Sequence, residues 1–337
     1  MRATISDIAR EAGVSTATVD RVLNQRSGVK SRTRDQVFTA AERLGYIDGA
    51  PRANAAPVAL DFLLPGGTNT FLHMLAGYVE EAAALRSGDV KVRVHRIDSF
   101  VPEMLAEKLH RLRGEVDGIA IIALDHPAVR EAIRELVARD VPVLTLVSDI
   151  SNVPRCGYVG IDNRAAGRLA GHLLGRFMAS GGGKVALFAG SLSYRGHEER
   201  EMGFRHMLAE GFPQLSIVQT REVRDDVDLA YTAAKELLHK VPDVGGIYNI
   251  GSGNRGIARA LEEAGLGQRI VFIGHEITPH TRRFLLSGVM DAVIDQNPRD
   301  EAREAIEQLA AAARGQVGDR MPSIRIEAIF RENIPAI

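Results

Sequence analysis

Short apolar runs of strand length alternate with longer amphipathic stretches from residue 58 almost to the end of the chain. The longer stretches repeat apolar residues every three or four positions, as the buried face of a helix does. Regular strand–helix alternation favours parallel sheets covered by helices on both faces. The expected strands are 58–64, 90–97, 117–123, 142–147, 157–161, 184–189, 215–222, 244–250, 269–274 and 291–295. The expected helices are 70–86, 102–113, 126–139, 163–180, 196–210, 227–240, 254–265 and 299–314.

About ten strands are too many for one small, compact sheet. We therefore expect two α/β lobes, each a doubly wound parallel sheet, with the chain passing between them near 160–162 and returning near 290.

The first 46 residues have a different pattern, with helical periodicity and no strand signal. Thr4 and Ser15 are good helix N-caps, and Gly13 marks a break between helices. Three short helices fit, followed by a linker poor in large apolar residues and bounded by Pro57. The expected organisation is an all-α head over 1–46, a hinge over 47–57 and a two-lobed α/β domain over 58–337.

Charge is distributed unevenly along the chain. The whole sequence has 42 Lys+Arg and 43 Asp+Glu, which argues against a wholly basic nucleic-acid binder. The head, however, has eight basic and five acidic residues, a net charge of +3, so that the remainder carries −4. The single cysteine, Cys156, excludes an intramolecular disulfide framework. Together with the absence of a secretory-type start and of any apolar run of about 20 residues, this predicts a cytoplasmic protein with no membrane partner.

Residues 4–24 have the pattern of a helix-turn-helix, with small residues and Gly13 at the turn. In this motif the N-terminal end of the second helix enters the major groove of DNA. Thr16, Ala17 and Arg21 would then face base edges, and Arg21 can donate two hydrogen bonds to guanine. Ser15, Thr18 and Asn24 would face phosphates. The alternative is an ordinary three-helix cap with solvated arginines.

The same region resembles the DNA-binding head of the lactose-repressor (LacI/GalR) family. The matching segments are Asp7-Ile8-Ala9, Ala12-Gly13-Val14-Ser15, Arg21-Val22-Leu23-Asn24 and Leu44-Gly45-Tyr46-Ile47. The resemblance implies a repressor whose paired heads read double-stranded, pseudo-palindromic operator DNA, in a homodimer or, alternatively, a tetramer. The expected DNA-binding residues are Thr4, Ser15, Thr16, Ala17, Thr18, Arg21, Asn24 and Arg52.

Two features depart from the family pattern. Asp20 places an acid beside the phosphates, so Arg21 or Arg26 has to compensate it. The linker 47–57 has no Leu to wedge into the minor groove, which predicts a weaker DNA bend, with Arg52 serving that groove.

Residues 58–337 resemble the effector domain of the same family, which has the type I periplasmic sugar-binding fold. The resemblance implies a small sugar or polyol held between the two lobes. By position, Phe71 would pack on this ligand, Arg200 would donate to its hydroxyls and Glu276 would accept from them. The expected ligand-binding residues are Phe71, Asp149, Arg200, Asn249, Glu276 and Gln296.

An enzyme is the alternative from another functional class. Gly251–Gly256 matches G-x-G-x-x-G between an expected strand and an expected helix, as in NAD-dependent oxidoreductases. The segment does not lie in a first βαβ unit, and no hydride-transfer pair is recognisable near it. The histidines do not have metal-ligand spacing either. We therefore expect no catalytic residues, no metal and no cofactor, and favour a ligand-responsive transcription regulator.

Overall fold

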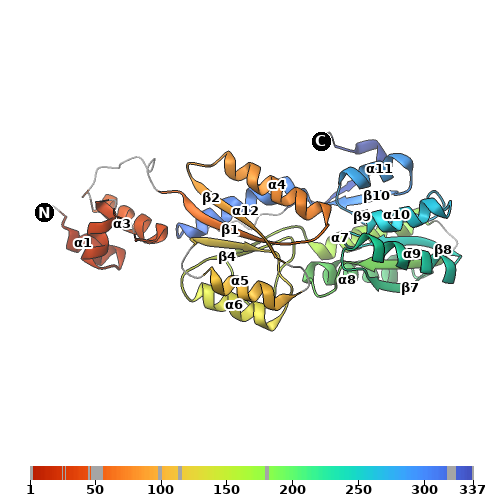
Figure 1. Cartoon of the computed structure of the whole chain (residues 1–337), viewed down its shortest axis with the longest axis horizontal. Helices are drawn as coiled ribbons and strands as arrows, with labels where there is room; N and C mark the ends of the chain where they lie inside the picture. The colour runs from red at the N-terminus through yellow and green to blue at the C-terminus, as the bar shows by residue number, and fades with distance from the viewer. Residues whose placement is uncertain are drawn as a thin grey trace.

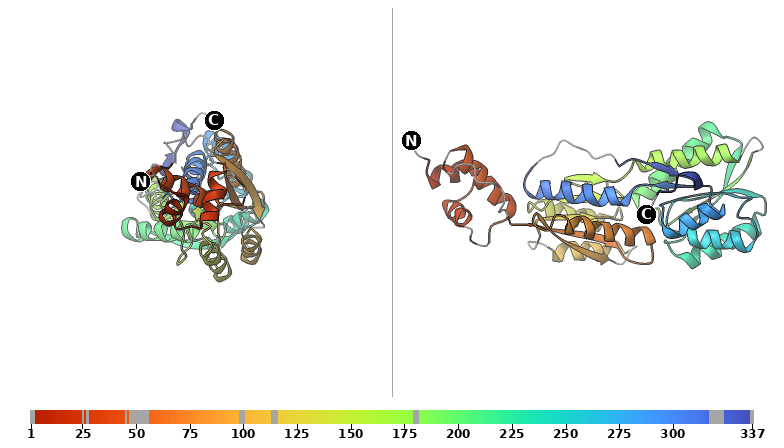
Figure 2. Two further views of the ribbon diagram at one scale, coloured as in Figure 1. Left: turned by 90° about the vertical axis from the view of Figure 1, so that its left-hand side faces the viewer. Right: turned by 90° about the horizontal axis from the view of Figure 1, so that it is seen from above.

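The computed structural model describes residues 3–24, 26, 28–44, 46, 56–97, 101–112, 116–178, 182–316 and 324–335. Three bodies follow one another along its long axis: a small helical head, a first lobe and a second lobe (Figures 1 and 2). The head meets the first lobe through Lys30, whose Nζ donates to the Arg139 carbonyl at 3.0 Å, and through an Arg32–Asp140 ion pair.

Three helices make up the head: α1 (Ile5–Ala12), α2 (Thr16–Leu23) and α3 (Ser31–Arg43). Thr4 and Ser15 cap the first two helices, and Gly13 ends α1 in the left-handed conformation, as predicted. The helices bury a small core that lies apart from the rest of the molecule. It consists of Ile8, Ala9, Val19, Val22, Val37, Ala40 and Ala41.

The first lobe is built on a parallel five-stranded sheet of order β2-β1-β3-β4-β5. Helices α4 and α12 cover one face, and α5 and α6 cover the other (Figure 1). The strands are β1 (Val58–Pro65), β2 (Val90–Ile97), β3 (Gly118–Ile121), β4 (Val143–Leu146) and β5 (Gly157–Val159). The helices are α4 (Thr70–Ala84), α5 (Pro102–Arg111), α6 (Pro127–Val137) and α12 (Pro298–Ala313).

The second lobe has a six-stranded sheet of order β11-β10-β9-β8-β6-β7. Helices α7 and α8 pack on one face, and α9, α10 and α11 on the other. The strands are β6 (Gly183–Ala189), β7 (Leu215–Glu222), β8 (Val244–Asn249), β9 (Val271–His275), β10 (Ala292–Asp295) and β11 (Glu327–Ile329). The helices are α7 (Asn163–Phe177), α8 (Arg195–Gly211), α9 (Val227–Lys240), α10 (Asn254–Glu263) and α11 (Pro279–Ser287), and a 3₁₀ turn, η3 (Arg331–Asn333), follows β11.

The predicted two doubly wound lobes are confirmed, with two additions. Strand β11 pairs antiparallel with β10, so the second sheet is not wholly parallel. Only three residues form this edge strand, too few for an alternation signal. Helix α11 was also not predicted. It depends on the capping box of Thr278 and Thr281, because its own residues are mostly polar or charged.

The chain crosses between the two lobes after β5 and again after β10. It first passes from β5 into α7, close to the predicted 160–162. It returns after β10, so that α12 starts at Pro298, slightly later than the predicted 290.

Two glycines allow α7 and α8 to pack closely. A Cβ on Gly167 would lie 1.9 Å from the Arg200 carbonyl oxygen, and one on Gly203 would lie 2.1 Å from the Arg164 carbonyl oxygen. Neither atom is the end of a flexible side chain, so only glycine fits this crossing.

Replacing Gly203→Ala should therefore destabilise the protein by about 1–3 kcal/mol, because the helices have to separate. Gly77→Ala on α4 is the matched control: its Cβ would meet nothing within 4 Å, and helix propensity should leave stability unchanged or raise it by up to about 1 kcal/mol. Urea denaturation of both variants measures the difference. Equal stability of the two would contradict the close packing of α7 on α8.

Candidate functional site

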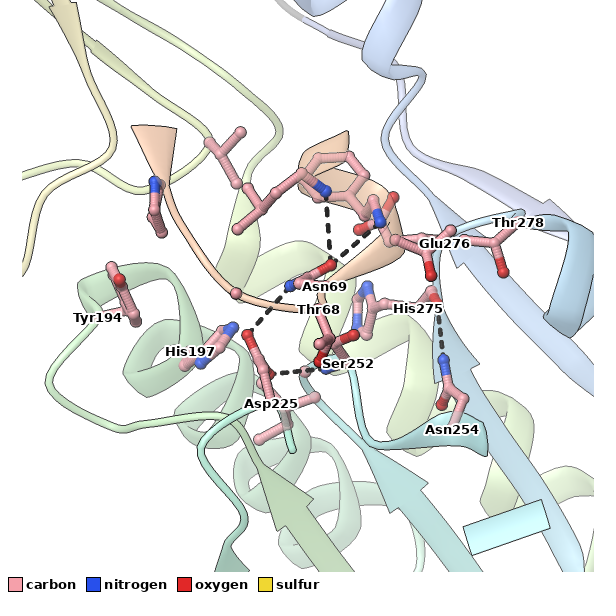
Figure 3. A pocket seen from close by; sticks show the side chains of 18 of the residues that line it. Thr68, Asn69, Tyr194, His197, Asp225, Ser252, Asn254, His275, Glu276 and Thr278 are labelled. Carbon is pink, nitrogen blue, oxygen red and sulfur yellow. Dashed lines mark hydrogen bonds between the residues drawn. The ribbon is translucent and has the colours of Figure 1, made fainter. Parts of the chain in front are cut away.

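A cavity of about 280 Å³ lies between the lobes, where strands of both sheets end (Figure 3). This is the position at which doubly wound sheets bind ligands. The first lobe lines it with the β1–α4 loop and the ends of β3 and β4. The second lobe lines it with the start of α8 and the loops after β7, β8, β9 and β10.

Arg200 on α8 is the most buried cation of the cavity wall, with 4% of its surface exposed. Its Nε donates to Asn163 Oδ1 at 2.7 Å, and Nη1 donates to the carbonyl of Ile250 at 3.1 Å. Nη2 donates more weakly to Gln296 Oε1, at 3.4 Å. The guanidinium group therefore joins the start of α7, the end of β8 and the end of β10.

Glu276 lies on the other side of Gln296. The Gln296 amide donates to Glu276 Oε1 at 2.5 Å, while Glu276 Oε2 is buried and has no hydrogen-bond partner among the described residues. Burial, together with the negative charge of Asp295, raises the pKa of Glu276 to about 8. At neutral pH this carboxyl is mostly protonated and can donate a hydrogen bond to a ligand.

A hydrogen bond across the cavity links the lobes. Asn69 caps α4, and its Nδ2 donates to Asp225 Oδ2 of the second lobe at 3.0 Å (Figure 3). Asp225 Oδ1 accepts the backbone N–H of Ser252 at 2.9 Å. A second link runs from the N–H of Gly196 to Ser148 Oγ, 3.0 Å apart. The lobes are thus closed on each other around the cavity.

Strained backbone is concentrated at this cavity. Seven described residues other than glycine have positive φ, and Val147, Arg224, Asp225 and Glu276 among them line the cavity. The β-branched Val147, with a φ of 64°, is an especially costly case. Such strain is kept where the surrounding structure fixes a functional geometry.

The structure brings four of the six expected ligand-binding residues together: Phe71, Arg200, Glu276 and Gln296 all line the cavity. Asn249 lies behind its wall, fully buried, and donates to the Gly251 carbonyl and to Asn254 Oδ1.

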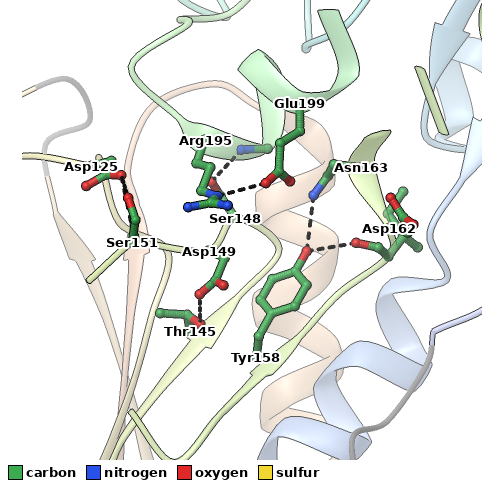
Figure 4. A network of polar contacts seen from close by, with 12 residues as sticks. Asp125, Thr145, Ser148, Asp149, Ser151, Tyr158, Asp162, Asn163, Arg195 and Glu199 are labelled. Carbon is green, nitrogen blue, oxygen red and sulfur yellow. Dashed lines mark hydrogen bonds and ion pairs between the residues drawn. The ribbon is translucent and has the colours of Figure 1, made fainter. Parts of the chain in front are cut away.

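Asp149 does not line the cavity, which corrects its assignment as a ligand-binding residue. It accepts from Thr145 Oγ1 (Figure 4). It also pairs with Arg155 of the first lobe. The neighbouring Asp125 is held similarly by Ser151 and Arg130.

The glycine-rich loop 251–256 is not an open phosphate cradle. The carboxylate of Asp225 already accepts the Ser252 N–H, and this acid would repel a phosphate placed on the backbone N–H groups of this loop. A Cβ on Gly256 would lie 2.1 Å from the Val227 carbonyl oxygen, so this glycine serves the packing of α10 on α9. The loop therefore does not support the dinucleotide-binding alternative.

Several cavity residues were not predicted as ligand-binding residues. Asn69, Asp225 and Thr278 come from loops whose course the sequence does not reveal, and His197 and His275 had no motif. Burial lowers the pKa of both histidines, so that they are neutral. His275 Nε2 and the Tyr248 hydroxyl share a hydrogen bond of 2.8 Å. Two sequence signals could have pointed to these residues: Asn69 directly precedes a helix, and Asp225 follows the end of a strand.

In the head, the expected base-reading residues Thr16, Ala17 and Arg21 are all exposed on α2. Thr4, expected to bind DNA, caps α1, and the expected phosphate contacts Ser15 and Thr18 lie at the start of α2, hydrogen-bonded to each other. Arg52 lies outside the described residues.

The negative charge of Asp20 is compensated by Arg26, one of the two arginines expected to do so. Arg26 pairs with it at 3.3 Å, and the Asn24 amide donates to its carboxylate at 2.8 Å. The Asn24 side chain thus has a partner within the head but stays exposed, and its contact with a phosphate remains a prediction.

The fold and the site define a class: an exposed helix-turn-helix joined to a two-lobed domain of the periplasmic-binding-protein type with an interlobe cavity. The comparisons agree. Residues 4–48 match "Bacterial regulatory proteins, lacI family", and residues 58–316 match "Periplasmic binding protein domain". The chain belongs to the lacI family of bacterial regulatory proteins.

Its relatives include transcription regulators. Catabolite control protein A of Priestia megaterium is 31% identical over 222 residues, which cover 63% of each chain. The HTH-type transcriptional repressor PurR of Vibrio vulnificus is 28% identical over 247 residues, 70% of this chain and 69% of the relative. The match thus spans less than two thirds of the first relative's length.

Solved structures of similar fold cover the two lobes. GanP, a glucose-galactose binding protein from Geobacillus stearothermophilus, has a TM-score of 0.74 and 25% identity over 82% of this chain and 99% of its own. A solute binding protein from Burkholderia graminis, in complex with D-arabinose, has a TM-score of 0.77 and 22% identity over 83% of this chain and 97% of its own.

The buried Glu276 carboxyl should make stability depend on pH. Its pKa of about 8 in the folded state lies above the ordinary 4.5, so the folded state binds more protons between these values and stability falls as pH rises. Glu276→Gln should gain stability over the original chain from about pH 5 to about pH 8, at up to about 1.4 kcal/mol per pH unit.

Urea denaturation at several pH values measures this gain. Glu263→Gln is the control, since hydrogen bonds from Tyr231 and Arg259 lower the pKa of that exposed acid. Its stability relative to the original chain should stay constant over the same range. A Glu276→Gln effect that is independent of pH would contradict the raised pKa.

Proposed function

We propose that the chain is a ligand-responsive transcription repressor that binds operator DNA as a homodimer in the cytoplasm. The observation that carries the proposal is the combination of a helix with exposed side chains suited to base reading and a cavity between two lobes with several polar side chains in its wall. The described helices include none long and apolar enough to cross a membrane.

DNA binding is assigned to the N-terminal end of α2. Thr16, Ala17 and Arg21 project from a helix whose other face is buried on α1 and α3. Ala17 and Thr16 suit contact with a thymine methyl group, and Arg21 suits guanine. The Arg26–Asp20 ion pair removes the repulsion that a bare carboxylate would cause beside phosphates.

Ligand binding is assigned to the interlobe cavity, where a small sugar or polyol is the expected class. Phe71 offers an apolar ring, while Arg200, Glu276 and Gln296 offer hydrogen-bonding groups. Pockets with an apolar wall and a few converging polar groups are typical small-molecule sites.

The two sites are coupled through the arrangement of the lobes. The ligand contacts both lobes, so its binding favours the closed arrangement held by the Asn69–Asp225 hydrogen bond. In a dimer, a shift of one lobe changes the separation of the two heads, and operator affinity changes by the ligand's differential affinity for the two arrangements.

Arg21→Ala should weaken operator binding roughly 10- to 100-fold, the effect of losing a bidentate guanine contact. The measurement is a mobility shift, under salt titration, on DNA selected from a random library by the original protein. Arg259→Ala, an exposed arginine on α10 paired with Glu263, is the control and should bind normally. A protein without salt-dependent DNA affinity would disprove the proposal.

Phe71→Leu should weaken binding of the sugar or polyol roughly 3- to 10-fold, because it keeps an apolar side chain but removes the ring face. A thermal-shift screen of five- and six-carbon sugars and polyols finds the ligand, and calorimetry measures its affinity. Asp149→Asn, outside the cavity, should leave that affinity unchanged. If Asp149→Asn lost ligand binding and Phe71→Leu kept it, the ligand would bind outside the interlobe cavity.

A further inference from the structure

Charge in the cavity wall is confined to one lobe. The first lobe contributes only neutral residues, among them Asn69, Phe71, Ile122, Val147 and Ser148. Every acidic, basic or histidine residue of the lining belongs to the second lobe. They are His197, Arg200, Arg224, Asp225, Asp226, Arg255, His275, Glu276 and His280. The electrostatics of the site are therefore set by how these groups are paired.

Arg200 is a buried cation whose protein partners are all neutral. It donates to the amide oxygen of Asn163, the carbonyl of Ile250 and the amide oxygen of Gln296. Within the described residues it forms no ion pair, and the buried carboxyls of Glu276 and Glu301, on which its charge acts, do not hydrogen-bond to it. A guanidinium group has five N–H donors, so two of them remain available to a ligand.

The acids of the cavity do not neutralise this cation. Glu276 is separated from Arg200 by Gln296, and its raised pKa of about 8 leaves it mostly protonated at neutral pH. Asp225 is engaged with Ser252 and Asn69. The carboxylate of Asp226 accepts two backbone N–H groups in the first turn of α9.

Two further arginines stand at the exposed part of the lining. Arg224 follows β7, Arg255 lies within the glycine-rich loop 251–256 at the start of α10, and both are exposed. Neither forms an ion pair with another described residue. With Arg200 they set three cations of the lining against the carboxylates of Asp225 and Asp226, which leaves a net charge of +1 while Glu276 is protonated.

We propose that the effector is an anion: a sugar acid or sugar phosphate of monosaccharide size, whose negative group binds Arg200. This inference rests on the proposed ligand-binding function and narrows its ligand class. The carboxylate or phosphate takes the two remaining N–H groups of the guanidinium. The hydroxyls face Gln296, Glu276 and the polar end of Asn69, and the carbon skeleton lies on Phe71.

The physical reason is the cost of a buried charge without a counter-ion. Removing a guanidinium group from water is unfavourable unless an opposite charge approaches it with good geometry. An oxyanion does so with charge-assisted, bidentate hydrogen bonds, roughly twice as strong as neutral ones. A protonated Glu276 can also donate to the anion, whereas an ionised one would repel it. The exposed arginines of the lining, Arg224 and Arg255, attract anions from solution.

The test compares matched ligands. Five- and six-carbon neutral sugars and polyols, the corresponding aldonates and uronates, and their phosphate esters are each titrated calorimetrically into the full-length protein. We expect at least one anion to bind about tenfold or more tightly than its neutral counterpart. The carboxylate and phosphate series distinguish the two sources of charge.

Two variants test the residues. Arg200→Gln should weaken binding of the anion about tenfold or more while changing the affinity for the neutral counterpart less. Because Arg200 is part of the buried wall, the exposed double variant Arg224→Gln/Arg255→Gln provides a second measurement that does not disturb the core. It should lower anion affinity several-fold, roughly 3- to 10-fold, and weaken its salt dependence. Arg259→Gln is the matched control and should bind as the original chain does.

A neutral sugar that binds more tightly than each of its anionic counterparts overturns the anionic class but leaves a ligand-responsive regulator intact. Failure of every compound to bind overturns the inference too, and the operator assay with Arg21→Ala then decides separately whether the chain is a DNA-binding regulator. Anion binding that the double variant and Arg200→Gln leave unchanged overturns the assignment to this cavity.

Discussion

The guanidinium group of Arg200 is the interaction on which the cleft depends. Its three hydrogen bonds connect the start of α7, the end of β8 and, through Gln296, the end of β10. These elements meet where the chain crosses between the lobes. The group that faces the cavity is therefore the same group that holds the crossing segments together. A ligand bound to Arg200 would act directly on the segments that cross between the lobes. This is the shortest route from ligand binding to a change in the arrangement of the lobes.

Much of the fold was predictable because it follows from periodicity. Alternating strands and helices, and caps such as Thr4 and Ser15, are local properties of a sequence, and the structure places them as expected. The short edge strand β11 and the short helix α11 were not predictable in this way. β11 is stabilised by pairing with β10, which is distant in sequence, whereas α11 depends on its own capping box, and neither is long enough to show a period.

The site was predictable only in part. Phe71, Arg200, Glu276 and Gln296 were expected from resemblance to a family, and they meet at the cavity. Asp149 was assigned from its position at a strand end, but its partner Arg155 holds it in the first lobe. Strand-end position does not reveal which way a loop turns.

The loop conformations themselves explain what was missed. Arg224 and Asp225 both adopt positive φ, and this turn brings the Asp225 carboxylate back towards Asn69 and Ser252. Neither residue type requires that conformation, so the sequence carries no sign of it. The ionic character of the cavity is equally hidden, because it depends on which charges find partners after folding and not on how many there are.

The return of α12 to the first lobe has a consequence for biosynthesis. This helix shares a core with the first lobe's strands: Leu309 lies against Gly118, and Ala302, Ala305 and Ile306 complete the same cluster. The first lobe is therefore discontinuous in sequence, and the sheet face that α4 and α12 share is covered only by α4 until the ribosome has translated beyond residue 313. The second lobe lacks only its last edge strand by then. During synthesis, the lobe that is made first is thus the one that completes its folding later. Until then it exposes an apolar surface that chaperones can recognise.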